Sequence, residues 1–128
     1  MPWTERHLAL HLARRLLDKS AEDLVVLAPP ASSGVPFDFV LIASGRNERM
    51  ARSLVDEAAH FCKRHRVVQR GIEGDGGWML LDCGPVVVHA FTEEKRAFYQ
   101  LDELWPDAER LDVERELARL PDPDKDAR

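Results

Sequence analysis

Residues 37–44, with the sequence FDFVLIAS, limit the fold of this chain more than any other segment. Apart from Asp38 and Ser44, they place apolar side chains at both alternating sets of positions, which is typical of a strand buried on both faces. A strand of this kind lies in the middle of a sheet that has helices packed against it. The segment therefore predicts an α/β protein in which residues 37–44 form a central strand.

Two amphipathic helices flank this strand in the sequence. Residues 5–19 repeat leucine at four-residue spacing, and Thr4 is positioned to cap the first turn of a helix. Residues 48–65 form a second apolar stripe at helical spacing, and Asn47 stands where an N-cap is expected. Both helices are therefore expected to pack one face on the sheet.

A strand, a crossover helix and a second strand follow one another in the middle of the chain. Residues 23–28 form a further short strand, closed by two prolines. Residues 67–72, with the sequence VVQRGI, are expected to return parallel to residues 37–44, and GDGG at 74–77 predicts a turn. The fold class predicted is a single α/β domain with a mixed sheet and helices packed against it.

Residues 78–91 predict a β-hairpin with its turn at 84–85. A two-residue loop would pair Leu81 with Val88, so one face of the hairpin would be wholly apolar and could pack on the helices. The opposite face would then carry Trp78, Leu80, Asp82, Val87, His89 and Phe91.

The C-terminal part is predicted to contain short helices. Thr92 is positioned to cap one, and residues 114–120 continue helically after a turn near Trp105. The domain is predicted to span residues 1–120. Residues 121–128, with the sequence PDPDKDAR, have a composition that buries little and are predicted to form a disordered acidic tail.

The formal net charge of −5 is unevenly distributed along the chain. Residues 1–70 sum to +3 and residues 71–128 to −8. An acidic surface repels a phosphate backbone and attracts basic proteins, so we expect no direct sequence-specific binding of nucleic acid. A basic protein partner or a merely solvated face would both account for the acidic half.

Apolar runs of the ~20 residues needed to span a bilayer do not occur in the sequence. Charges interrupt the N-terminal MPWTERHLAL, where a signal peptide would be apolar. These features predict a soluble cytoplasmic protein without a membrane partner. Cys62 and Cys83 are too few for a disulfide framework or a thiolate zinc site and are expected to be small buried residues.

His60, Cys62 and His65 are metal-ligating residue types close together in the sequence. On a helix, however, these positions point in directions that do not converge on one ion. The sequence therefore predicts no metal site.

Catalytic residues are also not expected. Ser44 and Gly45, at a strand end before a helix, resemble the entry to a nucleotidyltransferase site, but that chemistry needs two carboxylates one residue apart on a following strand. None of the predicted strands carries such a pair. Asp82 and His89 share a hairpin face, yet that face lacks the hydroxyl or thiol of a catalytic triad. The sequence thus predicts neither an enzyme nor a cofactor.

The mixed face of the hairpin allows two interpretations. His89 could be fixed by a polar neighbour within a packed sheet, or the face could bind another protein. Trp78 and Phe91 favour the second, because aromatic residues beside Asp and His are typical of interface hot spots. The first would hold if the N-terminal helix covered this face.

Two blocks in the second half resemble a known family. The pattern G-x-W-x-L-L-D-x-G-x-V-V-V-H-x-F, followed by R-x-F-Y-x-L-x-x-L-W, is similar in order and spacing to the ribosomal silencing factor family, also called RsfS or Iojap-like. DLVVLA and FDFVLIASG precede these blocks in the same order, and the resemblance runs from about residue 5 to residue 110.

The resemblance implies a fold like that of nucleotidyltransferases without their catalytic carboxylates. It also implies a function: members bind the large ribosomal subunit at large-subunit protein fourteen and hinder its joining to the small subunit when nutrients are scarce. Members also form homodimers, and the sequence leaves open whether this chain does. The alternative function is a nucleotide-binding or nucleotidyltransferase-like enzyme.

Partner-binding residues are assigned from the family motif and from the acidic segment beside it. They are Trp78, Leu80, Asp82, His89, Phe91, Tyr99, Asp102, Glu103 and Trp105.

Overall fold

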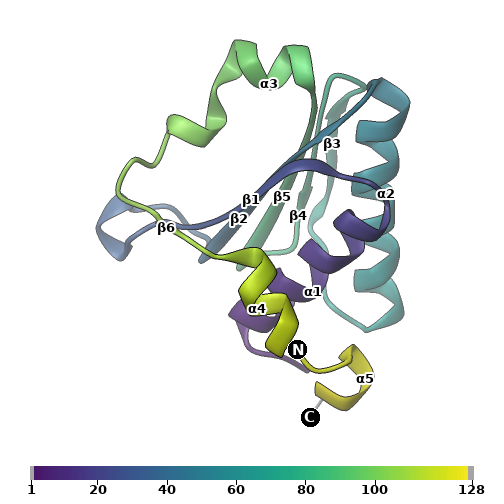
Figure 1. Cartoon of the computed structure of the whole chain (residues 1–128), viewed down its shortest axis with the longest axis vertical. Helices are drawn as coiled ribbons and strands as arrows, with labels where there is room; N and C mark the ends of the chain where they lie inside the picture. Colours follow the sequence, from purple (N-terminus) through teal and green to yellow (C-terminus); the bar gives the residue numbers. More distant parts are fainter. Residues whose placement is uncertain (1, 127–128) are drawn as a thin grey trace.

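A six-stranded mixed sheet organises the computed structural model, which describes residues 2–126 (Figure 1). The strand order is β3-β4-β5-β2-β1-β6. The strands are β1 (Glu22–Ala28), β2 (Phe39–Gly45), β3 (Gly71–Asp75), β4 (Trp78–Asp82), β5 (Val86–Thr92) and β6 (Glu109–Arg110). The helices are α1 (Glu5–Asp18), α2 (Glu48–Arg64), α3 (Glu93–Tyr99), α4 (Val113–Arg119) and α5 (Pro123–Asp126), with the 3-10 turns η1 (Ala31–Ser33) and η2 (Leu101–Glu103). The predicted α/β class with a mixed sheet is confirmed.

Side chains cap the helices where the sequence predicted caps. The Thr4 hydroxyl accepts a hydrogen bond from a backbone N–H in the first turn of α1 at 3.1 Å, and the Asn47 side chain does the same for α2 at 2.8 Å. Thr92 caps α3 in the same way. Each cap satisfies a backbone donor that has no partner within the helix, which fixes where the helix begins.

Strand β2 is the centre of the sheet, as predicted. It pairs antiparallel with β1 and parallel with β5, and all seven of its residues are buried. Strand β2 therefore carries apolar residues at successive positions because both faces of the sheet are buried there.

The prediction that residues 67–72 return parallel to the central strand is wrong. The parallel partner of β2 is β5, which pairs Phe39 with Val86 and Gly45 with Thr92. Residues 71–75 instead form the edge strand β3, antiparallel to β4 and exposed along its length. The physical reason is composition: β5 is apolar on both faces and fits the sheet centre, whereas β3 carries Glu73 and two glycines. The turn predicted at 74–77 is correspondingly shorter, because its first two residues belong to β3.

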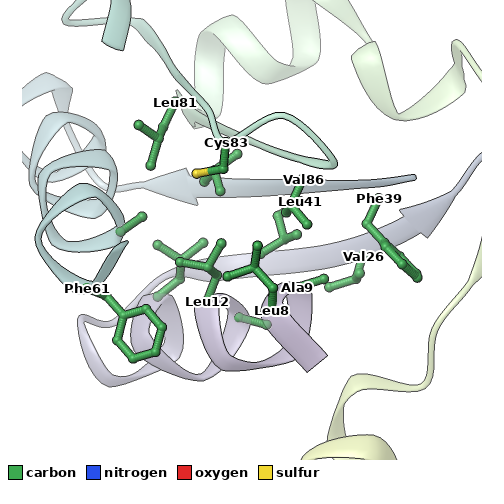
Figure 2. Close-up of a cluster of buried hydrophobic side chains, with 14 of the residues drawn as sticks. Leu8, Ala9, Leu12, Val26, Phe39, Leu41, Phe61, Leu81, Cys83 and Val86 are labelled. Carbon is green, nitrogen blue, oxygen red and sulfur yellow. The ribbon is translucent and has the colours of Figure 1, made fainter. Parts of the chain in front are cut away.

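The hairpin β4–β5 has the predicted register, with Leu81 opposite Val88 and the Cys83 N–H donating to the Val86 carbonyl at 2.9 Å. Its apolar face packs against α1 and α2. Figure 2 shows Leu81, Cys83 and Val86 facing Leu8 and Leu12 of α1. The main core therefore lies between these two helices and one face of the sheet.

The second face of the sheet has its own smaller core. Val40, Ile42 and Phe91 of the sheet are buried there against Leu101 and Trp105 of the segment that follows α3. In Figure 1, α3 and this segment lie on the opposite side of the sheet from α1 and α2. The N-terminal helix does not cover the second face; α3 and residues 101–108 cover part of it.

The C-terminal end differs from the predicted disordered tail. Residues Pro123–Asp126 form α5, and the Asp126 carboxylate lies within hydrogen-bond distance of His7 and His11 on α1. The Trp3 indole N–H also donates to the Pro123 carbonyl at 3.2 Å. These contacts join positions more than 110 residues apart, which composition cannot reveal; residues 127–128 lie outside the described residues.

Candidate functional site

The predicted partner-binding residues on the hairpin lie on the second face of the sheet. Trp78 stands opposite Phe91, with ring centroids 5.0 Å apart and nearly parallel planes. Tyr99 of α3 lies against the same indole at 4.6 Å. The structure thus brings together Trp78, Phe91 and Tyr99 in one aromatic stack. Phe91 is fully buried beneath it, so it supports the surface without forming part of it.

His89 is held by its neighbour on the hairpin. The Trp78 indole N–H donates to His89 Nδ1 at 3.0 Å, and only 8% of His89 is exposed. Burial lowers the pKa of His89 to about 4, because it disfavours the charged imidazolium. The imidazole is therefore neutral near pH 7 and orients the tryptophan as a hydrogen-bond acceptor.

Asp82 does not pair with His89. Its carboxylate accepts the N–H of Gly84 at 2.7 Å and so fixes the turn between β4 and β5. Gly84 has φ +81, a conformation that favours glycine. Leu80, and not Asp82, stands opposite His89 in the register. Asp82 is a turn residue in this structure, at the end of β4 remote from Trp78.

The segment after α3 is anchored by an arginine. Arg96 forms a two-point contact with the Asp102 carboxylate, at 2.7 and 3.2 Å, and also donates to the Ser44 hydroxyl at 2.9 Å. This contact ties η2 to the end of the central strand. The charge of Asp102 is thereby paired inside the molecule, whereas Glu103 beside it is exposed.

Trp105 lies in the small core of the second face. Its ring packs edge-on against Phe37 at 5.6 Å, and it is only partly accessible. The structure therefore separates Trp105 from the stack of Trp78 and Tyr99.

Large apolar side chains remain exposed on α3 and just after η2. Phe98 is 75% exposed, Leu104 61% and Tyr99 47%. The Phe98 and Tyr99 rings contact each other edge-on at 5.0 Å, which links Phe98 to the stack. We use the name α3 surface for Trp78, Leu80, Phe98 and Tyr99, together with the exposed Glu103 and Leu104 that follow α3 in the chain. Phe98 belongs to the family motif but was not among the predicted site residues, and Leu104 was missed, because a sequence does not show which side of a short helix stays uncovered.

A hollow of about 250 Å³ opens beside Trp78 on the α3 surface. Leu80, Lys95 and Tyr99 line it on one side, and Glu73 and Asp75 of β3 on the other. The prediction that no strand carries two carboxylates one residue apart is wrong, because Glu73 and Asp75 have that spacing on β3. Both are exposed on an edge strand, and Asp75 accepts the Gly77 N–H at 3.2 Å.

The histidines and cysteine considered as metal ligands on α2 lie in different environments. His60 is exposed, whereas Cys62 is buried with its sulfur 3.5 Å from that of Cys83. The prediction that both cysteines are buried is confirmed. Among residues 2–126, the side chains that could hold a metal ion are instead His7, His11 and Asp126, which sequence spacing alone could not bring together.

Within the described part of the chain, none of the helices has the length and apolar character needed to cross a membrane.

A family model and several relatives match most of this chain. The family model described as "Ribosomal silencing factor during starvation" matches residues 2–128. A ribosomal silencing factor RsfS from Halalkalibacterium halodurans is 34% identical over 99 residues, which cover 76% of this chain and 84% of that protein. The RsfS of Treponema pallidum is 37% identical over 100 residues, covering 75% and 87%.

Solved structures show the same fold. A protein of Chromobacterium violaceum superposes with a TM-score of 0.75 at 26% identity, covering 80% of this chain and 87% of that one. A protein of Bacillus halodurans superposes with a TM-score of 0.68 at 32% identity, covering 84% and 100%.

Proposed function

The chain belongs to the RsfS family of ribosomal silencing factors, and we propose that it binds the large ribosomal subunit through large-subunit protein fourteen and blocks joining of the small subunit. A ribosome-associated role in silencing translation follows from membership of the family. The proposal adds the partner, the cytoplasmic location and the mechanism, which is occupation of space without chemistry.

The α3 surface is the part of the molecule that best supports this proposal. Phe98 is exposed and is linked through Tyr99 to the half-buried Trp78, and exposed Leu104 follows η2. Such apolar area is typical of hot spots surrounded by weaker contacts. Glu93 and Glu94 in the first turn of α3 and Glu103 after it are exposed and add negative charge to this part of the molecule. Such negative charge suits a basic ribosomal protein, because charge complementarity steers association and excludes wrong partners.

We expect Phe98→Ala to weaken binding to isolated large subunits about thirtyfold, the effect of losing roughly 2 kcal/mol at a hot spot. Phe98 is the sharper test than Trp78, because Trp78 also stacks on Phe91 and bonds His89. Val68→Ala is the matched control, since Val68 is 80% exposed on the segment after α2. Co-sedimentation gives the affinity, and light scattering of mixed subunits gives joining.

A charge reversal tests the acidic part of the same surface. Glu103→Lys should weaken binding most at low salt, whereas Glu114→Lys, at an exposed position of α4, should not. Equal binding by wild type, Phe98→Ala and Glu103→Lys would place the contact elsewhere on the molecule. Absence of any binding to large subunits would contradict the proposed partner itself.

The alternative function is a nucleotidyltransferase-like enzyme, and Glu73 and Asp75 beside the hollow give it a specific place to be tested. Two carboxylates can hold Mg²⁺ together with substrate phosphates. These two are exposed at the sheet edge, with one of them engaged in a turn. We expect calorimetric titration with nucleoside triphosphates and Mg²⁺ to show no saturable binding. Micromolar binding that is lost in Asp75→Asn would favour the enzyme.

A further inference from the structure

His7, His11 and Asp126 form a cluster that the silencing function does not use. His7 and His11 lie one turn apart on α1, so both rings project from the same side of the helix. His7 Nδ1 lies 2.8 Å from one Asp126 oxygen, and His11 Nε2 lies 2.7 Å from the same oxygen. The three ligand atoms all lie within 4.8 Å of one another. Two ring nitrogens thus meet at one carboxylate oxygen.

We propose that this cluster is a binding site for a divalent transition-metal ion, with Zn²⁺ as the ion that its ligand set suits. Two histidines four residues apart on a helix are a spacing that lets both rings reach one zinc ion. A carboxylate from a distant segment completes a set of three protein ligands and leaves room for water. The ion would join α1 to α5.

The present geometry is close to what a metal ion requires. Two ligands each about 2.0 Å from a tetrahedral zinc ion lie roughly 3.3 Å apart. The nitrogen–oxygen distances of 2.7 to 3.0 Å therefore need to widen by about half an ångström, and the two ring nitrogens, which now both point at one oxygen, must turn toward the ion. Asp126 ends a short helix of four residues, so a small shift of this segment supplies that movement.

Acidic and basic side chains both lie next to the cluster. Asp122 and Asp124 lie in the same segment and line a surface hollow of about 240 Å³ next to His11. Arg14, Arg15 and Arg64 line this hollow too, and their positive charges oppose a cation.

The other ring nitrogen of His11 limits the expected affinity for zinc. In metal sites the other ring nitrogen of a ligating histidine usually donates to a polar group, which strengthens the site. Within the described residues, His11 Nδ1 is buried without such a partner. A dissociation constant on the order of 10 μM is therefore expected, weaker than at a fully supported structural zinc site.

Titration of the untagged full chain with ZnCl₂ tests the proposal. We expect one zinc ion to bind per chain and the melting temperature to rise with zinc concentration. Co²⁺ bound in place of zinc should show the visible absorption spectrum of a low-symmetry coordination site. His7→Ala and Asp126→Asn should each weaken zinc binding by about tenfold or more. His60→Ala and Asp107→Asn are the matched controls, because both residues are exposed and lie outside the cluster and the hollow beside it.

Two results would overturn the site. Absence of saturable binding below about 1 mM zinc would show that Asp126 only hydrogen-bonds the two histidines. Binding that is unchanged in both His7→Ala and Asp126→Asn, or that His60→Ala abolishes, would place the ion elsewhere on the surface. Loss of the site should leave large-subunit binding intact, since the α3 surface does not include these residues.

Discussion

Leu81→Ala lowers the free energy of unfolding by about 2 to 5 kcal/mol, the range expected when a buried leucine is truncated and a cavity remains. Leu81 is fully buried between the sheet and the helices that cover it. Leu80 provides the matched control, because it is the same residue type one position away and half-buried on the other face. Leu80→Ala should destabilise clearly less. Urea unfolding of both variants measures the difference, and a larger effect at Leu80 would show that the faces are reversed.

Lowering the pH from about 6.5 to 4 removes ~3 kcal/mol of stability through His89 alone. Unfolded His89 takes up a proton near its ordinary pKa of 6.5, whereas burial holds the folded pKa near 4. Between these values the unfolded state binds more protons, so the stabilisation is complete above pH 6.5 and is lost as the pH falls toward 4.

The variant His89→Gln isolates this contribution. Its side-chain oxygen can still accept the Trp78 indole N–H, but it does not titrate. The stability of wild type measured by urea unfolding should fall more steeply with decreasing pH than that of His89→Gln, whereas exposed His60→Gln should follow wild type. Parallel pH profiles for wild type and His89→Gln would show that His89 is accessible to protons in the folded state.

Local sequence patterns predicted most of the elements of the fold. The caps at Thr4 and Asn47, the central strand and the hairpin register each follow from a few neighbouring residues. The parallel partner of the central strand was not predicted correctly. Residues 67–72 contain apolar residues, but β5 is apolar on both faces and therefore fits the sheet centre better. Pairing across long separations is a property of the whole chain.

The candidate site was predictable to a smaller extent. The family motif pointed to Trp78 and Tyr99, which the structure brings into contact. It could not show that Phe91 is buried or that Asp102 is paired with Arg96, because both depend on how the segment after α3 folds back over the sheet. Exposure of Phe98 depends on that same segment.

The pairing of β2 with β5 also determines how fast and in what order this protein folds. Phe39 pairs with Val86, so the central ladder joins positions 47 residues apart, and His7 contacts Asp126 across 119. Loop-closure entropy must be overcome before such distant contacts stabilise anything, which slows folding relative to helical bundles of similar size. During synthesis, β2 can pair with β1 early, but it remains without its parallel partner until β5 has been made. Docking of α5 on α1 is expected to be among the last steps.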